Sequence, residues 1–187
     1  MSRVTSIEEL SNLKSKIETE RKFTKQVLIC GGTGCISSGS NEIADKMTEK
    51  VKAAGKENEI RVIKTGCFGF CEKGPIVKML PDNTFYTEVT PEDADRLVET
   101  HLLKEEKIEE LLYVDPVTKN KISDSDHMDF YKKQERVALR NCGVIDPENI
   151  EDYLLYDGYT ALDKVLKMSQ QEVVDIMKDS GLRGRGG

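Results

Sequence analysis

The sequence has no long hydrophobic run, only two histidines and no excess of basic residues. No apolar stretch approaches the roughly 18 residues that indicate a membrane span, and residues 1–10 lack the apolar core of a signal peptide. Neither membrane insertion nor secretion is therefore expected, and the predicted location is the cytoplasm. The 28 Lys and Arg against 34 Asp and Glu give a net charge of −6, so nucleic acid is not an expected partner.

Apolar residues are also few, at 37% of the 187 residues, which predicts that part of the chain is loosely packed. The length indicates one compact domain with an appendage. Residues 1–104 are balanced in charge, so the whole net charge lies in residues 105–187. This difference marks a first and a second part of the chain.

The first part has the pattern of a small α/β layer. Residues 1–23 contain an amphipathic helix in which Ile7, Leu10, Leu13 and Ile17 form one apolar stripe. Residues 24–104 are predicted to form one domain. Its expected elements are a buried strand at 26–30, a crossover helix at 41–54, a neighbouring strand at 59–63, a hairpin at 76–87 and a closing helix at 91–103 capped by Thr90.

The second part is predicted to be mostly helical. Residues 105–128 have the pattern of an acidic helix and an exposed linker. The helices expected beyond them span residues 129–141, residues 147–155 with Asp146 as cap, residues 159–167, and a segment from the Ser169 capping box to Gly181. The chain ends on a glycine-rich stretch directly after the last helix, so we expect a truncated product.

Four of the five cysteines form two close pairs, each beginning where a predicted strand ends. Cys30 and Cys35 are spaced C-x4-C, and Cys67 and Cys71 are spaced C-x3-C. Two adjacent parallel strands would bring these thiols together at one edge of the sheet, and thiolates select zinc or iron–sulfur clusters. The glycines around both pairs can turn backbone N–H groups toward the metal or sulfides, which fits a cluster better than a single ion.

Several other interpretations of the cysteines are open. They could be ordinary buried cysteines, a four-cysteine zinc site, or the thiols of a redox sensor. Neither pair has the C-x-x-C spacing of thiol exchange proteins. A Rieske centre needs two histidine ligands, whereas His101 and His127 are remote from the pairs in sequence and are predicted to lie at the surface. Cys142 stands alone and is predicted to be a small buried hydrophobe.

The segment Cys30-Gly-Gly-Thr-Gly-Cys35-Ile-Ser-Ser-Gly39, with Cys67-Phe-Gly-Phe-Cys71-Glu-Lys-Gly-Pro75, resembles the thioredoxin-like 2Fe-2S ferredoxin domain. In that family the domain occurs in the small subunit of the NADH-oxidising module of complex I. It is also fused to the N-terminus of hydrogenase and formate dehydrogenase flavoprotein subunits. The resemblance covers residues 24–104 and implies that Cys30, Cys35, Cys67 and Cys71 ligate one 2Fe-2S cluster.

The second part resembles the helical leader of those flavoproteins. The resemblance lies in Arg140-Asn-Cys-Gly143, in Asp146-Pro-Glu148 and in the ending Ser180-Gly-Leu-Arg-Gly-Arg-Gly-Gly187, which is similar to the opening of their FMN loop. It implies that residues 129–187 are an incomplete flavoprotein segment. In a complete homologue, FMN would be contacted by Gly184, Arg185, Gly186 and Gly187. The rest of the FMN and NADH sites has no counterpart, so this chain alone is expected to bind no FMN and to oxidise no NADH.

These features predict a one-electron relay that exchanges electrons with a flavin site. The resemblance implies partner subunits of a hydrogenase, formate dehydrogenase or NADH dehydrogenase complex that uses NADH or NADPH. The alternative is a zinc-stabilised four-cysteine interaction module with no redox role. Iron and sulfide content distinguishes these two hypotheses.

Overall fold

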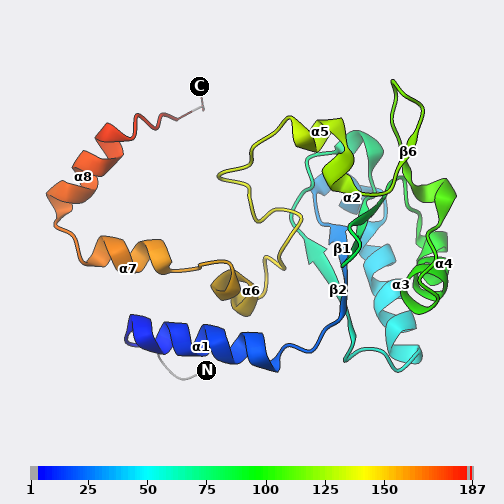
Figure 1. The fold of residues 1–187 in the computed structure, drawn as a ribbon, viewed down its shortest axis with the longest axis horizontal. Helices are drawn as coiled ribbons and strands as arrows, with labels where there is room; N and C mark the ends of the chain where they lie inside the picture. Colours follow the sequence, from blue (N-terminus) through cyan, green and yellow to red (C-terminus); the bar gives the residue numbers. More distant parts are fainter. Residues whose placement is uncertain (1–3, 185, 187) are drawn as a thin grey trace.

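A four-stranded mixed sheet, in the order β2-β1-β3-β4, forms the centre of the computed structural model, which describes residues 4–184 and 186 (Figure 1). β1 (Lys25–Cys30) runs parallel to β2 (Ile60–Thr65), and the two are joined by α3 (Ser40–Ala53). β3 (Val77–Leu80) pairs antiparallel with β1 on one side and with β4 (Thr84–Tyr86) on the other. The predicted parallel neighbours, helical crossover and hairpin are therefore confirmed.

The alternation of side chains along β1 divides the core into two layers. Val27 and Ile29 pack on one face with α3 and with the helical segment 91–103. Leu28 and Cys30 pack on the opposite face, where Phe85 is also buried. Because neighbouring side chains of a strand point to opposite faces, the short apolar run of β1 supplies both layers. Cys30 thereby ends the strand inside the core.

The helical segment 91–103 begins as predicted. Thr90 and Asp93 form a capping box, and α4 (Ala94–Arg96) continues into a wider helical turn at Leu97–Leu103. The prediction of a surface position for His101 is wrong. This side chain is buried, and its Nδ1 lies 2.7 Å from the hydroxyl of Tyr86. The helix turns His101 inward because a buried tyrosine hydroxyl requires a partner there.

The burial of His101 has a measurable consequence for stability below neutral pH. Burial lowers the pKa of His101 and outweighs the opposing effect of Asp82. As the pH falls through about 6.5, His101 becomes protonated in the unfolded chain but stays neutral in the folded chain. The free energy of unfolding therefore decreases as the pH falls below this value. We expect the free energy of unfolding to decrease by at most about 1.4 kcal/mol per pH unit. Urea unfolding of His101→Gln should lose this slope, whereas the exposed His127→Gln should keep it; equal slopes in all three proteins would contradict the assignment.

Residues 105–128 differ from the predicted acidic helix and exposed linker. They contain only short turns of 3-10 helix and a hairpin of β5 (Tyr113–Val114) and β6 (Lys121–Ile122). The segment covers the outer edge of β4, where the N–H groups of Phe85 and Thr87 donate to Ser123 and Leu111 at 2.8 and 2.9 Å. These bonds satisfy an edge strand that would otherwise expose its backbone. Four apolar residues of this polar stretch are buried there, Ile108, Leu112, Tyr113 and Met128, whereas Val114 and Val117 are exposed.

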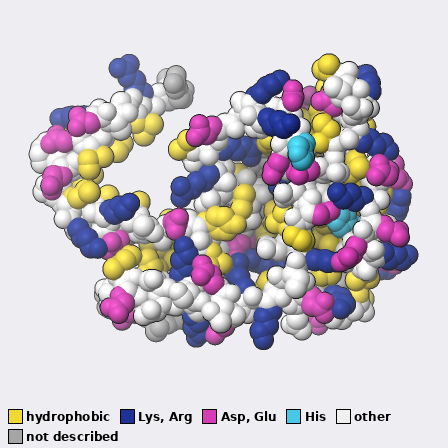
Figure 2. Space-filling view, viewed as in Figure 1, with side chains coloured by type: hydrophobic (Ala, Val, Ile, Leu, Met, Phe, Trp, Pro, Cys, Tyr) yellow, Lys and Arg dark blue, Asp and Glu magenta, His cyan; other side chains and the backbone are white. Residues whose placement is uncertain are grey.

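The remaining helices are short and the last two leave the core. α5 (Asp129–Lys132) is much shorter than the predicted 129–141 helix, and α6 (Ile150–Leu155) is capped by Asn149 rather than by Asp146. α7 (Thr160–Leu166) and α8 (Gln170–Asp179), with the predicted Ser169 capping box, form an arm directed away from the sheet (Figure 1). No residue of α7 or α8 is buried. Figure 2 shows hydrophobic side chains exposed along this arm, which accounts for the predicted loosely packed part.

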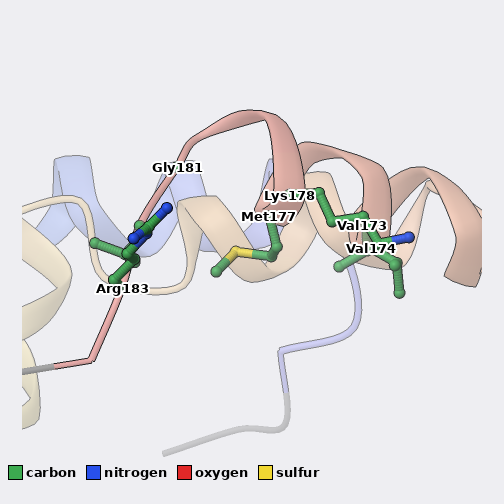
Figure 3. Close-up of a pocket in the computed structure, with 7 residues that line it drawn as sticks. Val173, Val174, Met177, Lys178, Gly181 and Arg183 are labelled. Atoms are coloured by element: carbon green, nitrogen blue, oxygen red, sulfur yellow. The ribbon is translucent and has the colours of Figure 1, made fainter. Parts of the chain in front are cut away.

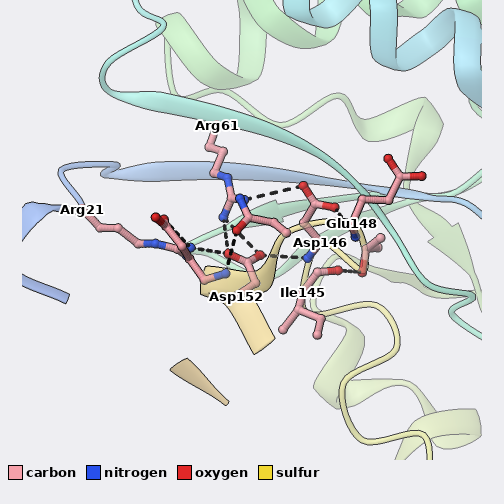
Figure 4. Close-up of polar contacts among 9 residues, drawn as sticks. Arg21, Arg61, Ile145, Asp146, Glu148 and Asp152 are labelled. Carbon is pink, nitrogen blue, oxygen red and sulfur yellow. Dashed lines mark hydrogen bonds and ion pairs between the residues drawn. The ribbon is translucent and has the colours of Figure 1, made fainter. Parts of the chain in front are cut away.

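A buried carboxylate attaches α1 (Ile7–Glu20) and α6 to the sheet (Figure 4). Asp152 is only 3% exposed and accepts hydrogen bonds from Arg61 of β2 at 2.8 Å and from Arg21 at the end of α1. It also accepts the backbone N–H of Asp146 at 2.8 Å. Three segments far apart in sequence therefore meet at one side chain.

Among the described residues, no helix has the length and apolar character of a membrane span.

Candidate metal centre

The two cysteine pairs lie at the same end of the two parallel strands. Cys30 closes β1 and is the register partner of Thr65, the last residue of β2. Cys35 follows in α2 (Thr33–Ser37), a short helix that the sequence pattern did not indicate. Cys67 is separated from the end of β2 by Gly66, and Cys71 begins the next turn. The structure thus brings together the loops that carry all four predicted residues, because the parallel pairing aligns both strand ends.

Glycine is required where these loops approach each other. A Cβ atom on Gly32 would lie 3.1 Å from the sulfur of Cys67 and 3.5 Å from that of Cys30. A Cβ atom on Gly74 would lie 2.5 Å from the sulfur of Cys35. A side chain at Gly32 would press against the sulfurs of both cysteine pairs, and one at Gly74 would clash with the sulfur of Cys35. The glycines of the two loops therefore serve close approach as well as backbone conformation.

The four cysteines differ in burial, from the core to the surface. Cys30 and Cys35 are 1% and 2% exposed, Cys67 is half-buried and Cys71 is exposed. Burial, together with the adjacent Cys30, raises the pKa of Cys35 to about 12. A hydrogen bond and charge repulsion from Cys67 raise the pKa of Cys71. Thiols crowded in this way remain protonated unless a cation offsets their charge, which is the role of a bound metal.

The geometry and donors of the site suit two metal atoms with two thiolates each. Two sulfurs bound to one tetrahedral metal at about 2.3 Å lie about 3.8 Å apart, and the sulfurs of Cys67 and Cys71 are separated by 3.9 Å. Cys30 and Cys35, the other pair, are both buried in one core cluster. Within residues 4–184 and 186, no three His, Cys, Asp or Glu side chains are gathered closely enough to hold one ion. Four thiols in two pairs, one of them with its sulfurs 3.9 Å apart, fit a thiolate-bound iron–sulfur cluster.

A backbone donor also faces this sulfur-rich site. The N–H of Gly69, at a φ of +78°, donates to the sulfur of Cys67 at 3.2 Å. Such N–H···S bonds are the usual way in which a protein offsets the negative charge of a thiolate-bound cluster. The prediction that loop glycines direct N–H groups toward the site is realised at this position.

Of the four residues predicted to contact FMN, the two that the structure describes lie far from the cysteines. Gly184 and Gly186 are exposed at the end of the arm, and Arg185 and Gly187 lie outside the described residues. Figure 3 shows a shallow pocket along α8 and the turn at Gly181, which ends at Arg183, next to Gly184 in sequence. Its lining is mostly apolar and includes Val173, Val174, Met177 and Arg183. It contains no residue of the cysteine loops.

The sequence pattern missed a second layer over the cysteine loop. Residues 131–145, which we call the cover segment, contact residues 65–69 through Tyr131, Arg136 and Gly143. Cys142 belongs to it and is half-buried rather than buried, with its sulfur 3.3 Å from the position of a Cβ on Gly66. The glycines at 66, 69 and 143 were the available signal, since each permits a close contact between the two segments.

Known proteins resemble the first part of the chain. The model of the thioredoxin-like [2Fe-2S] ferredoxin family matches residues 3–102. A 2Fe-2S ferredoxin from Clostridium pasteurianum is 36% identical over 77 residues, which are 41% of this chain and 76% of that protein. The solved thioredoxin-like [2Fe-2S] ferredoxin from Aquifex aeolicus is 33% identical, with a TM-score of 0.44 over 48% of this chain and 95% of that one.

A larger relative extends the comparison. The NADP-reducing hydrogenase subunit HndC of Solidesulfovibrio fructosivorans is 64% identical over 56 residues, which are 30% of this chain and only 11% of that protein. A subunit of the NADH-quinone oxidoreductase of Aquifex aeolicus is 51% identical over 39 residues, 9% of its length. The match to the family model and the cysteine geometry lead to one assignment: the chain belongs to the thioredoxin-like [2Fe-2S] ferredoxin family, and its cofactor is a 2Fe-2S cluster.

Proposed function

We propose that this chain is a one-electron relay in which Cys30, Cys35, Cys67 and Cys71 ligate the 2Fe-2S cluster. The observation that carries the proposal is the meeting of two cysteine pairs at the ends of β1 and β2, with one sulfur pair 3.9 Å apart. When bound, the cluster accepts and releases one electron. The protein supplies the thiolates, excludes water on the side of Cys30 and Cys35, and leaves Cys71 exposed.

The exposed cysteine indicates where a redox partner would dock. Electron transfer favours a short path, and Cys71 offers the path of least covering protein. We therefore propose that a redox partner docks over Cys71 and the neighbouring turn Cys71–Lys73. The buried pair of Cys30 and Cys35 faces the core and holds the opposite side of the cluster.

We propose that the partners are subunits of a larger oxidoreductase complex. Relatives of the chain are named as subunits of an NADP-reducing hydrogenase and of NADH-quinone oxidoreductase, and the chain spans only 11% and 9% of two of them. In this proposal electrons pass to or from a flavin site served by NADH or NADPH, and formate dehydrogenase is a further candidate complex. Contact of Gly184, Arg185, Gly186 and Gly187 with FMN belongs to the same proposal, as does a reducing compartment such as the cytoplasm.

The test is an absorption and EPR spectrum of the anaerobically purified chain before and after dithionite, with iron, sulfide and zinc measured on the same sample. We expect a broad visible thiolate-to-iron band that bleaches on reduction and an EPR signal in the reduced state only. A colourless chain that retains zinc would overturn the proposal and leave the zinc-stabilised interaction module as the interpretation.

A further inference from the structure

One peptide group in the cysteine loop is hydrogen-bonded on both sides. The peptide joins Phe68 to Gly69, and its N–H donates to the sulfur of Cys67 at 3.2 Å. Its carbonyl oxygen, on Phe68, accepts the hydroxyl of Tyr131 at 3.1 Å and the guanidinium of Arg136. The same peptide therefore connects a predicted ligand on one side with two donors of the cover segment on the other.

The cover segment is held against this peptide by close packing. A Cβ on Gly69 would lie 3.2 Å from Nη2 of Arg136, and a Cβ on Gly143 would lie 2.7 Å from the ring of Phe68. The guanidinium of Arg136 also lies over the ring of Tyr131, 5.0 Å from its centroid. Both side chains are half-buried, and side-chain positions restrained in this way make their bonds to the carbonyl persistent.

Hydrogen bonds at a carbonyl strengthen the donor at the other end of the same peptide. Two donors on the oxygen, one of them charged, polarise the peptide and make its N–H more positive. A more positive N–H stabilises the sulfur most when the cluster carries its extra electron, and the nearby guanidinium charge acts in the same direction. Both effects favour the reduced state.

We propose that Tyr131 and Arg136 are positioning residues that raise the reduction potential of the cluster by acting on Cys67 through the Phe68–Gly69 peptide. The proposal rests on the proposed function, because it takes Cys67 as a ligand. Tyr131 and Arg136 lie outside residues 3–102, the part that the family model matches. The second part of the chain thus adjusts the cofactor of the first.

The test is a potentiometric titration of the full chain with its cluster, followed by visible absorbance and EPR. Arg136→Gln removes both charge and bond, and we expect it to lower the equilibrium constant for reduction about tenfold, or about 59 mV for one electron. Tyr131→Phe removes one bond and should shift the potential in the same direction by less. Arg136→Lys keeps the charge and should recover part of the shift. Arg140→Gln is the matched control, since Arg140 is exposed and lines the same pocket as Arg136.

The possible outcomes distinguish a failure of this inference from a failure of the proposed function on which it rests. A wild-type chain without the visible band would overturn the proposed function, and the inference with it. A wild-type chain with its cluster and equal potentials in Arg136→Gln and Tyr131→Phe would overturn only the inference. A shift in Arg140→Gln as large as that in Arg136→Gln would also overturn it, because net charge alone would then suffice. If Arg136→Gln loses the cluster, the Tyr131→Phe potential decides.

Discussion

Replacing Cys30 with alanine is expected to abolish the visible absorption of the protein and to remove its bound iron. Cys30 is 1% exposed at the end of β1, so no solvent-derived ligand reaches its position easily. Alanine has no donor atom, and a metal atom left with one thiolate of its pair is bound far more weakly. The change in side-chain volume is small, so the fold tolerates it at a cost of about 1 kcal/mol. Iron and sulfide per chain, with the visible spectrum, measure the effect.

The matched control is Cys142→Ala. Cys142 is a half-buried cysteine that packs beside Gly66, yet it belongs to neither pair. We expect this variant to keep its full iron content and visible band. Retention of iron by Cys30→Ala, or equal losses in both variants, would show that the ligand set proposed here is incorrect.

Replacing Asp152 with asparagine is expected to cost about 3 kcal/mol in the free energy of unfolding. The carboxylate is 3% exposed, and its loss leaves Arg21 and Arg61 close together without their shared counter-charge. α1 and α6 then lose the side chain that attaches them to β2. Urea unfolding at pH 7, together with amide exchange along α1, measures both the stability and the position of the loss.

The pH dependence distinguishes charge from packing at Asp152. Burial raises the pKa of Asp152, but the hydrogen bonds from Arg61, the Asp146 N–H and Arg21 outweigh burial and lower it below its ordinary value. The lowered pKa stabilises the fold above about pH 4, and this contribution is lost as the pH falls further. The difference in the free energy of unfolding between wild type and Asp152→Asn should therefore become smaller below about pH 4.

Asp157→Asn is the control for this effect. Asp157 also pairs with α1, through Lys14 at 3.0 Å, but its side chain is 68% exposed. An exposed ion pair contributes at most about 1 kcal/mol, and salt reduces it further. A loss in Asp157→Asn equal to that in Asp152→Asn would contradict the special role of the buried carboxylate.

Patterns that depend on near neighbours predicted most of the first part of the chain. The apolar run of β1, the hairpin turn at Pro81 and the N-cap at Thr90 each specify a local element, and each is present, as is the Ser169 capping box of the second part. The meeting of the cysteine pairs was predictable for the same reason, because each pair begins at or just after the end of a strand and parallel strands align their ends. Spacing and glycine content then indicated a thiolate-bound cluster.

Contacts between distant residues overrode local pattern in the second part. The predicted 129–141 helix ends after Lys132, where the chain turns so that Arg136 reaches the carbonyl of Phe68. Asp146 caps no helix, because its N–H is held by Asp152 and its carboxylate lies 3.7 Å from Arg61. In each case a half-buried charged group gains more from its partner than a helix gains from one more turn.

The sequence alone therefore determined the parallel pairing of the two strands beside the cysteines, the kind of cofactor and the family resemblance. All of these depend on residue type and short-range spacing. Tertiary structure alone decided that residues 105–128 cover the edge of β4, that His101 is buried against Tyr86, and that the cover segment bonds the peptide beside Cys67. Those features depend on which distant groups satisfy buried donors and acceptors, and short-range periodicity carries no information about such partners.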